Sequence, residues 1–175
     1  HDAELDRMAL EKPVQFDAVR TGRDDVALLG FTSGTTGQPK ATMHFHRDLQ
    51  AINDTVARHV LKPDENDVFT GSPPIAFTFG LGALVTFPMS AGSSTVLVER
   101  YTPETTLQMV QEKKVSVLFT APTAYRVITD MVADYDISSL KKCVSAGETL
   151  PLATWQGWYD ATGIRIIDGL GSTEI

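Results

Sequence analysis

Thr-Ser-Gly-Thr-Thr-Gly-Gln-Pro-Lys, residues 32–40, is the stretch that says most about the fold of this chain and about its ligand. Its two glycines allow a tight turn and let the backbone approach a ligand closely. Its hydroxyl groups and amides are donors and Lys40 adds a positive charge, which suits a polyphosphate because backbone N–H groups bind anions. A polar surface loop that binds nothing has a similar composition, so the spacing alone leaves both interpretations open.

Two common nucleotide-binding motifs do not fit this stretch. A Walker loop ends in Gly-Lys-Ser/Thr, whereas Lys40 lies between Pro39 and Ala41. No Gly-x-Gly-x-x-Gly sequence opens a predicted helix, which argues against a dinucleotide-binding fold of the usual kind. A phosphate site at residues 32–40 is therefore of another type.

The stretch resembles the phosphate-binding signature of the adenylate-forming superfamily, which includes acyl-CoA synthetases, peptide-synthetase adenylation domains and luciferases. The usual form is an aromatic residue followed by Thr-Ser-Gly-Thr-Thr-Gly-x-Pro-Lys-Gly. This chain has Phe31 first and Ala41 in place of the last glycine. The resemblance implies that the phosphates of ATP are bound by Thr32, Ser33, Gly34, Thr35, Thr36, Gly37 and Lys40.

Segments with strand and helix patterns alternate along the chain, which predicts an α/β fold with a mainly parallel sheet flanked by helices. Strands are expected at residues 26–31, 41–45, 68–71, 94–98, 115–119, 142–145 and 164–167, the fifth of them central. Helices are expected at 47–61, 80–87, 123–133 and 152–161, and another begins at Thr102-Pro103, where threonine caps the first turn. The apolar faces of the helices at 47–61 and 123–133 are expected to be Leu49, Ile52, Val56 and Val60, and Val127, Ile128 and Met131.

The composition of the chain excludes several classes of function. Its 175 residues suffice for one domain with a core, and its hydrophobic (42%) and charged (21%) shares are those of a soluble globular protein. A formal net charge of -7 argues against a nucleic-acid or anionic-membrane partner, which needs a basic surface. The single cysteine, Cys143, cannot form an internal disulfide and is expected to be a buried apolar residue. The lack of an internal disulfide and of a signal-peptide pattern at the N-terminus together favour a cytoplasmic location.

Residues 69–98 carry no charged side chain and are numerous enough to span a bilayer. Prolines and glycines interrupt them, at Pro73, Pro74, Gly80, Gly82 and Pro88 among others. Short buried elements are therefore expected here rather than a transmembrane helix.

A second informative loop follows the last predicted strand, at residues 168–174, Asp-Gly-Leu-Gly-Ser-Thr-Glu. Ligands of open α/β sheets bind at the carboxyl ends of strands, so this loop is expected to line one crevice with residues 33–40 and 146–151. A carboxylate beside a triphosphate needs a cation such as Mg²⁺. An exposed side chain without a ligand is the default interpretation of an isolated glutamate such as Glu174.

The superfamily's signature in this region is Asn/Asp-x-Tyr-Gly-x-Thr-Glu, which residues 168–174 resemble except that Leu170 stands at the tyrosine position. The resemblance implies a Mg²⁺ ligand in Glu174 and catalytic roles for Thr173 and Glu174. It further implies AMP contacts from Asp168, Gly169, Leu170, Gly171 and Thr173. Apolar packing by Leu170 then replaces the usual aromatic platform for adenine, at some cost in affinity.

Two more stretches resemble superfamily motifs. Residues 145–151, Ser-Ala-Gly-Glu-Thr-Leu-Pro, resemble the adenine-side loop and imply that Gly147 and Glu148 lie against the base; an ordinary strand-to-helix turn is the alternative. Residues 77–82, Phe-Thr-Phe-Gly-Leu-Gly, resemble the acyl-substrate motif and imply an acyl pocket at Thr78, Phe79 and Gly80. Taken alone, these aromatic residues are typical of a core. The motifs together look most like the benzoate-CoA and 2-aminobenzoate-CoA ligase branch, which implies an aromatic acid in a flat apolar pocket.

His44 and His46 alternate on a predicted strand, a spacing that allows both side chains to face one side. A zinc site needs more ligands, and the only cysteine is far along the chain, which argues against metal binding by this pair. The resemblance gives His46 a helix-entry or packing role.

The resemblance implies that residues 1–175 belong to the N-terminal, AMP-binding domain of an enzyme whose C-terminal domain, with the catalytic lysine, is absent from this chain. The whole enzyme would join an aromatic carboxylic acid to ATP, giving acyl-AMP and pyrophosphate, and would then transfer the acyl group to CoA. The chain alone is expected to be inactive and to self-associate as a homo-oligomer through exposed apolar surface. The alternatives are a non-catalytic ATP- or AMP-binding module, an adenylation domain for another acyl acceptor, and a purely structural domain.

Overall fold

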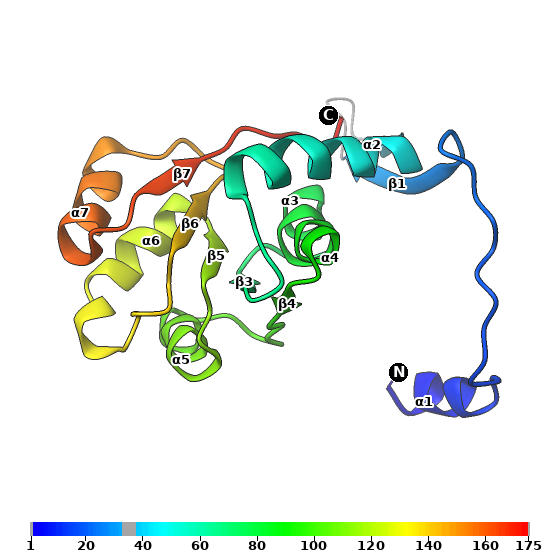
Figure 1. The fold of residues 1–175 in the computed structure, drawn as a ribbon, viewed down its shortest axis with the longest axis horizontal. Helices are drawn as coiled ribbons and strands as arrows, with labels where there is room; N and C mark the ends of the chain where they lie inside the picture. Colours follow the sequence, from blue (N-terminus) through cyan, green and yellow to red (C-terminus); the bar gives the residue numbers. More distant parts are fainter. Residues whose placement is uncertain (1, 33–37, 175) are drawn as a thin grey trace.

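A computed structural model of the chain describes residues 2–32 and 38–174. The body is a five-stranded parallel sheet with the strand order β4-β3-β5-β6-β7 (Figure 1), which confirms the predicted fold class. The central position predicted for β5 is also confirmed. The strands are β3 (Val68–Gly71), β4 (Ser94–Thr95), β5 (Val117–Thr120), β6 (Lys142–Ser145) and β7 (Ile166–Asp168).

Helices cover both faces of this sheet, and each face has its own apolar core. One face packs on α5 (Pro103–Lys113), α6 (Pro122–Thr129) with the short turn η3 (Val132–Asp134), and α7 (Leu152–Thr162). The other packs on η1 (Asn53–Leu61), α3 (Thr78–Leu81), η2 (Gly82–Thr86) and α4 (Phe87–Ala91). In β5, Leu118 enters the first core and Val117 and Phe119 the second, because successive side chains of a strand point to opposite faces.

Strands β1 (Val26–Thr32) and β2 (Lys40–Phe45) form a separate two-stranded antiparallel sheet. The strand predicted at residues 26–31 is therefore present, but it lies outside the parallel sheet. Only residues 33–39 connect the two strands, and a parallel connection needs a crossover of about a dozen residues or more. The chain continues from β2 directly into α2 (His46–Ile52).

The predicted helix at residues 47–61 is present as α2 followed by η1, but its expected apolar face is wrong in the second half, whereas Leu49 and Ile52 are half-buried. Val56 and Val60 are exposed, whereas Ala57 and Leu61 are buried. η1 is a π-helical segment, whose i→i+5 hydrogen bonds turn the side chains out of the 3.6-residue period used for the prediction.

Helix α6 buries a different residue from the one expected. Ile128 is buried as predicted, but Val127 is exposed and Tyr125 takes the inner position. The Tyr125 hydroxyl lies 3.1 Å from both the Leu118 and the Val144 carbonyl oxygens, so it bridges β5 and β6 inside the core. A buried tyrosine hydroxyl usually needs a hydrogen-bond partner. The spacing of apolar residues, from which the buried face was predicted, contains no information on that partner.

The helix at α5 begins as the sequence predicts. Thr102 is the N-cap, and its hydroxyl accepts a 3.2 Å hydrogen bond from the backbone N–H of Thr105, while Pro103 occupies the first turn.

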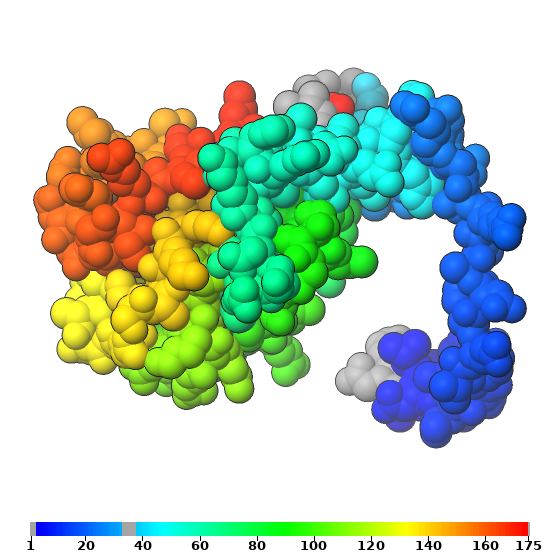
Figure 2. Space-filling view, in the orientation of Figure 1, coloured from blue at the N-terminus to red at the C-terminus, as the bar shows by residue number. Residues whose placement is uncertain are grey.

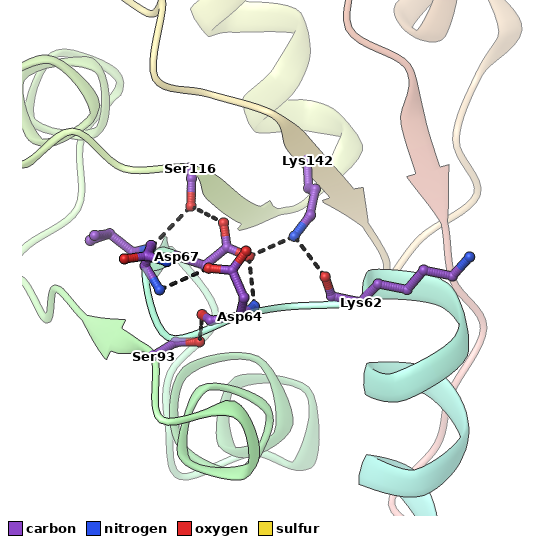
Figure 3. A network of polar contacts seen from close by, with 8 residues as sticks. Lys62, Asp64, Asp67, Ser93, Ser116 and Lys142 are labelled. Carbon is purple, nitrogen blue, oxygen red and sulfur yellow. Dashed lines mark hydrogen bonds and ion pairs between the residues drawn. The ribbon is translucent and has the colours of Figure 1, made fainter.

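A polar network ties the amino ends of β3, β5 and β6 together (Figure 3). The Asp67 carboxylate is 1% exposed and accepts a 2.6 Å hydrogen bond from the Lys142 ammonium and another of 2.6 Å from the Ser116 hydroxyl. Lys142 also donates to the carbonyl oxygen of Lys62, at 3.1 Å, where η1 ends. Burial raises the pKa of Asp67, but the hydrogen bonds from Lys142 and Ser116 outweigh it and hold the pKa below its usual value.

The N-terminal helix α1 (Asp2–Leu10) and the extended segment after it lie apart from the body (Figure 2). This segment exposes apolar side chains, which include Leu10, Val14, Phe16 and Val19. Residues 69–98 form short elements, as predicted, and no helix in the described part of the chain is long and apolar enough to cross a membrane.

Candidate functional site

In the β1–β2 hairpin, the predicted phosphate loop, residues 32–40, runs from the last residue of β1 to the first residue of β2. Thr32 and Lys40 lie opposite each other in the antiparallel register, and Lys40 is exposed. The other residues predicted to bind phosphate lie outside the described residues; they are Ser33, Gly34, Thr35, Thr36 and Gly37. The hairpin therefore delivers one hydroxyl and one ammonium to the two ends of that loop.

The loop at residues 168–174 starts beside the predicted adenine-side loop. Asp168 pairs with Ser145 in the parallel register, and the Gly169 N–H donates a 2.8 Å hydrogen bond to the Ser145 carbonyl oxygen. Residues 146–151 leave the sheet at the same place, because β6 and β7 are neighbours. Two motifs expected to contact AMP thus begin at adjacent strand ends.

Gly147 and Glu148 have defined structural roles in the adenine-side loop. Gly147 has φ +92°, a backbone conformation that favours glycine. A carboxylate oxygen of Glu148 accepts hydrogen bonds from the Thr123 hydroxyl and, at 3.0 Å, from the Thr123 N–H in the first turn of α6. These hydrogen bonds lower the pKa of Glu148. The carboxylate therefore attaches the loop to the start of α6, where the N-cap residue Ala121 has no side-chain acceptor.

The far end of the loop at residues 168–174 is attached to the hairpin. The Thr173 carbonyl oxygen lies 2.6 Å from His44 Nε2 and 3.2 Å from the Thr42 hydroxyl. A carbonyl oxygen only accepts, so Nε2 of His44 carries the proton and donates it. Gly30 makes room for this contact, because a Cβ there would lie 2.7 Å from Cγ2 of Thr173.

One cavity of about 400 Å³ joins two of the predicted motifs. Thr78, from the predicted acyl motif, and Glu174, the predicted Mg²⁺ ligand, both line it. Most of its wall is apolar, and it lies among the hairpin, α2 and the α3–η2 segment. The apolar wall includes Leu28, Met43, Leu49, Ile52 and Leu81, and the polar wall includes Thr42, His44 and Asp48.

Phe79 and Gly80, the other two residues of the predicted acyl motif, are not among the residues that line this cavity. The Phe79 ring packs edge-on against Phe119, with ring centroids 6.1 Å apart, in the core on this face of the sheet. Gly80 is buried, and a Cβ there would lie 2.1 Å from the Pro74 carbonyl oxygen. In this structure both residues serve packing, and their contact with an acyl substrate stays a prediction.

Leu170 is 99% exposed, so its side chain is free to meet a ligand but makes no packing of its own. Asp168, Gly171 and Glu174 are exposed as well.

The histidine pair does not share one strand face. His44 lies in β2, whereas His46 is the first residue of α2, which agrees with its expected place at a helix entry. Among residues 2–32 and 38–174, no group of three or more His, Cys, Asp or Glu side chains is placed to hold a metal ion. Cys143 is fully buried as predicted, and burial raises the pKa of its thiol to about 12.

Sequence reasoning missed Thr42 and His44 as attachment points and Thr123 as the partner of Glu148. Thr42 and His44 are two residues apart on a strand, so they share a face, and this alternation was the available signal. Nothing local marks Thr123, because its partner lies 25 residues away in the chain.

Comparisons with known proteins identify the family of the chain. The family described as "AMP-binding enzyme" matches residues 2–175. A benzoate–CoA ligase from Thauera aromatica is 35% identical over 92% of this chain and 31% of its own length. A p-hydroxybenzoic acid–AMP ligase from Mycobacterium tuberculosis is 36% identical over 88% of this chain and 22% of its own length.

Among solved structures, the chain is similar to two further CoA ligases. An anthranilate-CoA ligase, AuaEII, in complex with anthranoyl-AMP has a TM-score of 0.89 and 34% identity over 97% of this chain and 33% of its own. A benzoate-CoA ligase from Burkholderia xenovorans LB400 has a TM-score of 0.80 and 32% identity over 90% of this chain and 32% of its own. The chain spans a third or less of the length of each of these four relatives. From its match along residues 2–175, this chain belongs to the family of AMP-binding enzymes.

Proposed function

We propose that this chain is the AMP-binding part of an enzyme that activates an aromatic carboxylic acid with ATP, as acyl-AMP, and transfers the acyl group to CoA. The observation that carries the proposal is the meeting of the phosphate hairpin with the loop at residues 168–174, at a largely apolar cavity lined by Thr78 and Glu174. Four relatives named for activation of benzoate, hydroxybenzoate or anthranilate support an aromatic substrate.

The proposed assignment gives each part of the site one task. Thr32 and Lys40, with residues 33–37, bind the β- and γ-phosphates. Residues 147–148 and 168–171 bind adenosine, and Thr173 contacts the α-phosphate. The apolar cavity receives the aromatic ring, because a planar apolar group is favoured in a pocket with few polar groups.

The attack of the acid on the α-phosphorus is favoured mainly by positioning and by charge neutralisation. In an acidic chain the single ammonium of Lys40 concentrates positive charge at the hairpin, where pyrophosphate leaves. A Mg²⁺ ion fits the residues present, because Glu174 supplies a hard carboxylate oxygen at the cavity and phosphate oxygens complete such a site. When bound, Mg²⁺ neutralises phosphate charge.

A ligase that stops at the acyl-AMP or uses an acceptor other than CoA is the second candidate. It is favoured by the relative named as a p-hydroxybenzoic acid–AMP ligase, whose identity with this chain, 36%, matches that of the benzoate–CoA ligase, 35%. The two candidates share the first half-reaction, so both predict release of pyrophosphate when ATP and an aromatic acid are present.

ATP titration of the chain by calorimetry tests the nucleotide site. We expect ATP with Mg²⁺ to bind the wild type and Lys40→Ala to weaken binding about tenfold or more, since a charge-assisted hydrogen bond contributes about 1.5–3 kcal/mol. Lys12→Ala, which removes an exposed lysine next to α1, is the matched control and should bind as the wild type does. Absence of ATP binding by the wild type would overturn the proposed nucleotide site.

Pyrophosphate release by the complete enzyme tests the substrate. We expect benzoate, 4-hydroxybenzoate or 2-aminobenzoate to drive release and medium-chain fatty acids not to do so. The appearance of an acyl-CoA then separates the CoA ligase from the second candidate. Selective activation of aliphatic acids would refute the aromatic assignment.

A further inference from the structure

We propose that His44 is a positioning residue of the site: its Nε2–H holds the Thr173 carbonyl and thereby fixes Glu174 against the hairpin that carries Lys40. The contact is 2.6 Å long and joins residues 129 positions apart in the chain. The inference rests on the proposed function for the role of Glu174, but the contact itself stands on geometry alone.

The loop at residues 168–174 is held at two points that belong to different sheets. At its start, the Gly169 N–H is bonded to Ser145 at the end of β6 in the parallel sheet. Near its end, the Thr173 carbonyl is bonded to His44 in the antiparallel hairpin. Because β1 and β2 pair with each other and not with the parallel sheet, this loop is a link between the phosphate hairpin and the adenine-side loop, in addition to the chain that continues from β2 into α2 and η1.

The surroundings of His44 favour a fixed rather than an incidental contact. His44 and Thr42 are half-buried, and the Thr42 hydroxyl, 3.2 Å from the same carbonyl, lies 3.1 Å from the Gly30 carbonyl oxygen. The lack of a side chain at Gly30 lets Thr173 approach the strand closely. The Nε2–H of His44, the Thr42 hydroxyl, whose one hydrogen is shared between the Gly30 and Thr173 carbonyls, and the gap at Gly30 therefore form a socket for the Thr173 peptide.

The position of Glu174 follows from this socket, because Glu174 is the next residue in the chain and lines the same cavity as His44. A displacement of about 1 Å in such a group is enough to reduce catalysis strongly. His44 thus has no contact with the nucleotide in this proposal and acts through the backbone of the loop.

The alternative is that His44 only fills space in the cavity wall. Two variants separate the alternatives: His44→Leu keeps apolar volume but removes the donor, whereas His44→Gln keeps an N–H donor on a side chain of similar reach. His59→Leu removes an exposed histidine of η1 and serves as the matched control.

The first measurement needs no ligand. Backbone ¹⁵N order parameters of Thr173 and Glu174 should be near 0.85 in the wild type, in His44→Gln and in His59→Leu, and should fall below about 0.6 in His44→Leu. Equal values in the wild type and His44→Leu, or a His44→Gln variant as mobile as His44→Leu, would overturn the inference.

The second measurement is the ratio of ATP dissociation constants without and with Mg²⁺. We expect His44→Leu to reduce this ratio about three- to tenfold, as the loss of one hydrogen bond implies, and to change ATP binding without Mg²⁺ less than twofold. A wild type that binds no ATP would refute the proposed function. The order parameters would still show whether His44 holds the Thr173 peptide in place. A ratio unchanged in His44→Leu, with ATP bound, would overturn the positioning role alone.

Discussion

Replacement of Lys142 by methionine should destabilise the chain by about 3 kcal/mol at pH 7, the low end of what breaking a buried ion pair costs. The Asp67 carboxylate would stay buried at 1% exposure and lose its charged partner. It would keep hydrogen bonds from the Ser116 hydroxyl and the Asp64 N–H, and the Lys142 side chain is itself 22% exposed, which is why the low end applies.

The pH dependence of this loss follows from the pKa of Asp67. In the wild type the pKa is lowered below 3.8, so Asp67 contributes stability that is present above that value and lost as the pH falls through its folded pKa. In Lys142→Met, burial would raise the pKa of Asp67 instead, so the variant would be relieved of its buried charge as the pH falls. The difference in unfolding free energy should therefore shrink between pH 7 and pH 4.

Urea unfolding followed by tryptophan fluorescence, from Trp155 and the buried Trp158, measures this difference, with equal slopes for both proteins as the check on two-state behaviour. The matched control is Lys114→Met, which breaks an ion pair with Asp136 in which the side chains are 61% and 49% exposed. The control should have little effect, because exposed ion pairs contribute little. Equal effects of the two substitutions, or a loss that grows toward pH 4, would refute the reasoning.

Three further predictions concern two helical glycines, a loop and the thiol. Gly80→Ala should destabilise by about 1–3 kcal/mol in urea unfolding, because its Cβ would meet a backbone carbonyl oxygen at 2.1 Å; Gly157→Ala, in helix α7 with open space around it, should stabilise by up to about 1 kcal/mol. A ¹³C titration should place the pKa of Glu148 below 4.5, and Thr123→Val should raise it; equal midpoints would contradict the contact. Cys143 should resist alkylation in the native chain and react once urea unfolds it; rapid native labelling would contradict its burial and raised pKa.

Much of the fold could be predicted because its causes are local. β3 and β6 lie at the predicted residues. Thr102-Pro103 predicted the start of α5 correctly, because capping depends only on residues within the first turn of the helix. Val56, Val60 and Val127 were assigned to the core wrongly, because a π-helical segment and a buried tyrosine hydroxyl change which face is turned inward.

The sequence by itself determined the family, the order of the motifs and the alternation of strands and helices, because each depends on residues close together in the chain. The tertiary structure alone decided that the two phosphate strands lie outside the parallel sheet and that His44 holds Thr173. It also decided that Glu148 is bonded to the start of α6 and that Phe79 packs on Phe119. The contacts of His44, Glu148 and Phe79 each join residues at least 25 positions apart in the chain. No local pattern encodes such distances, because they are fixed only when the whole core has formed.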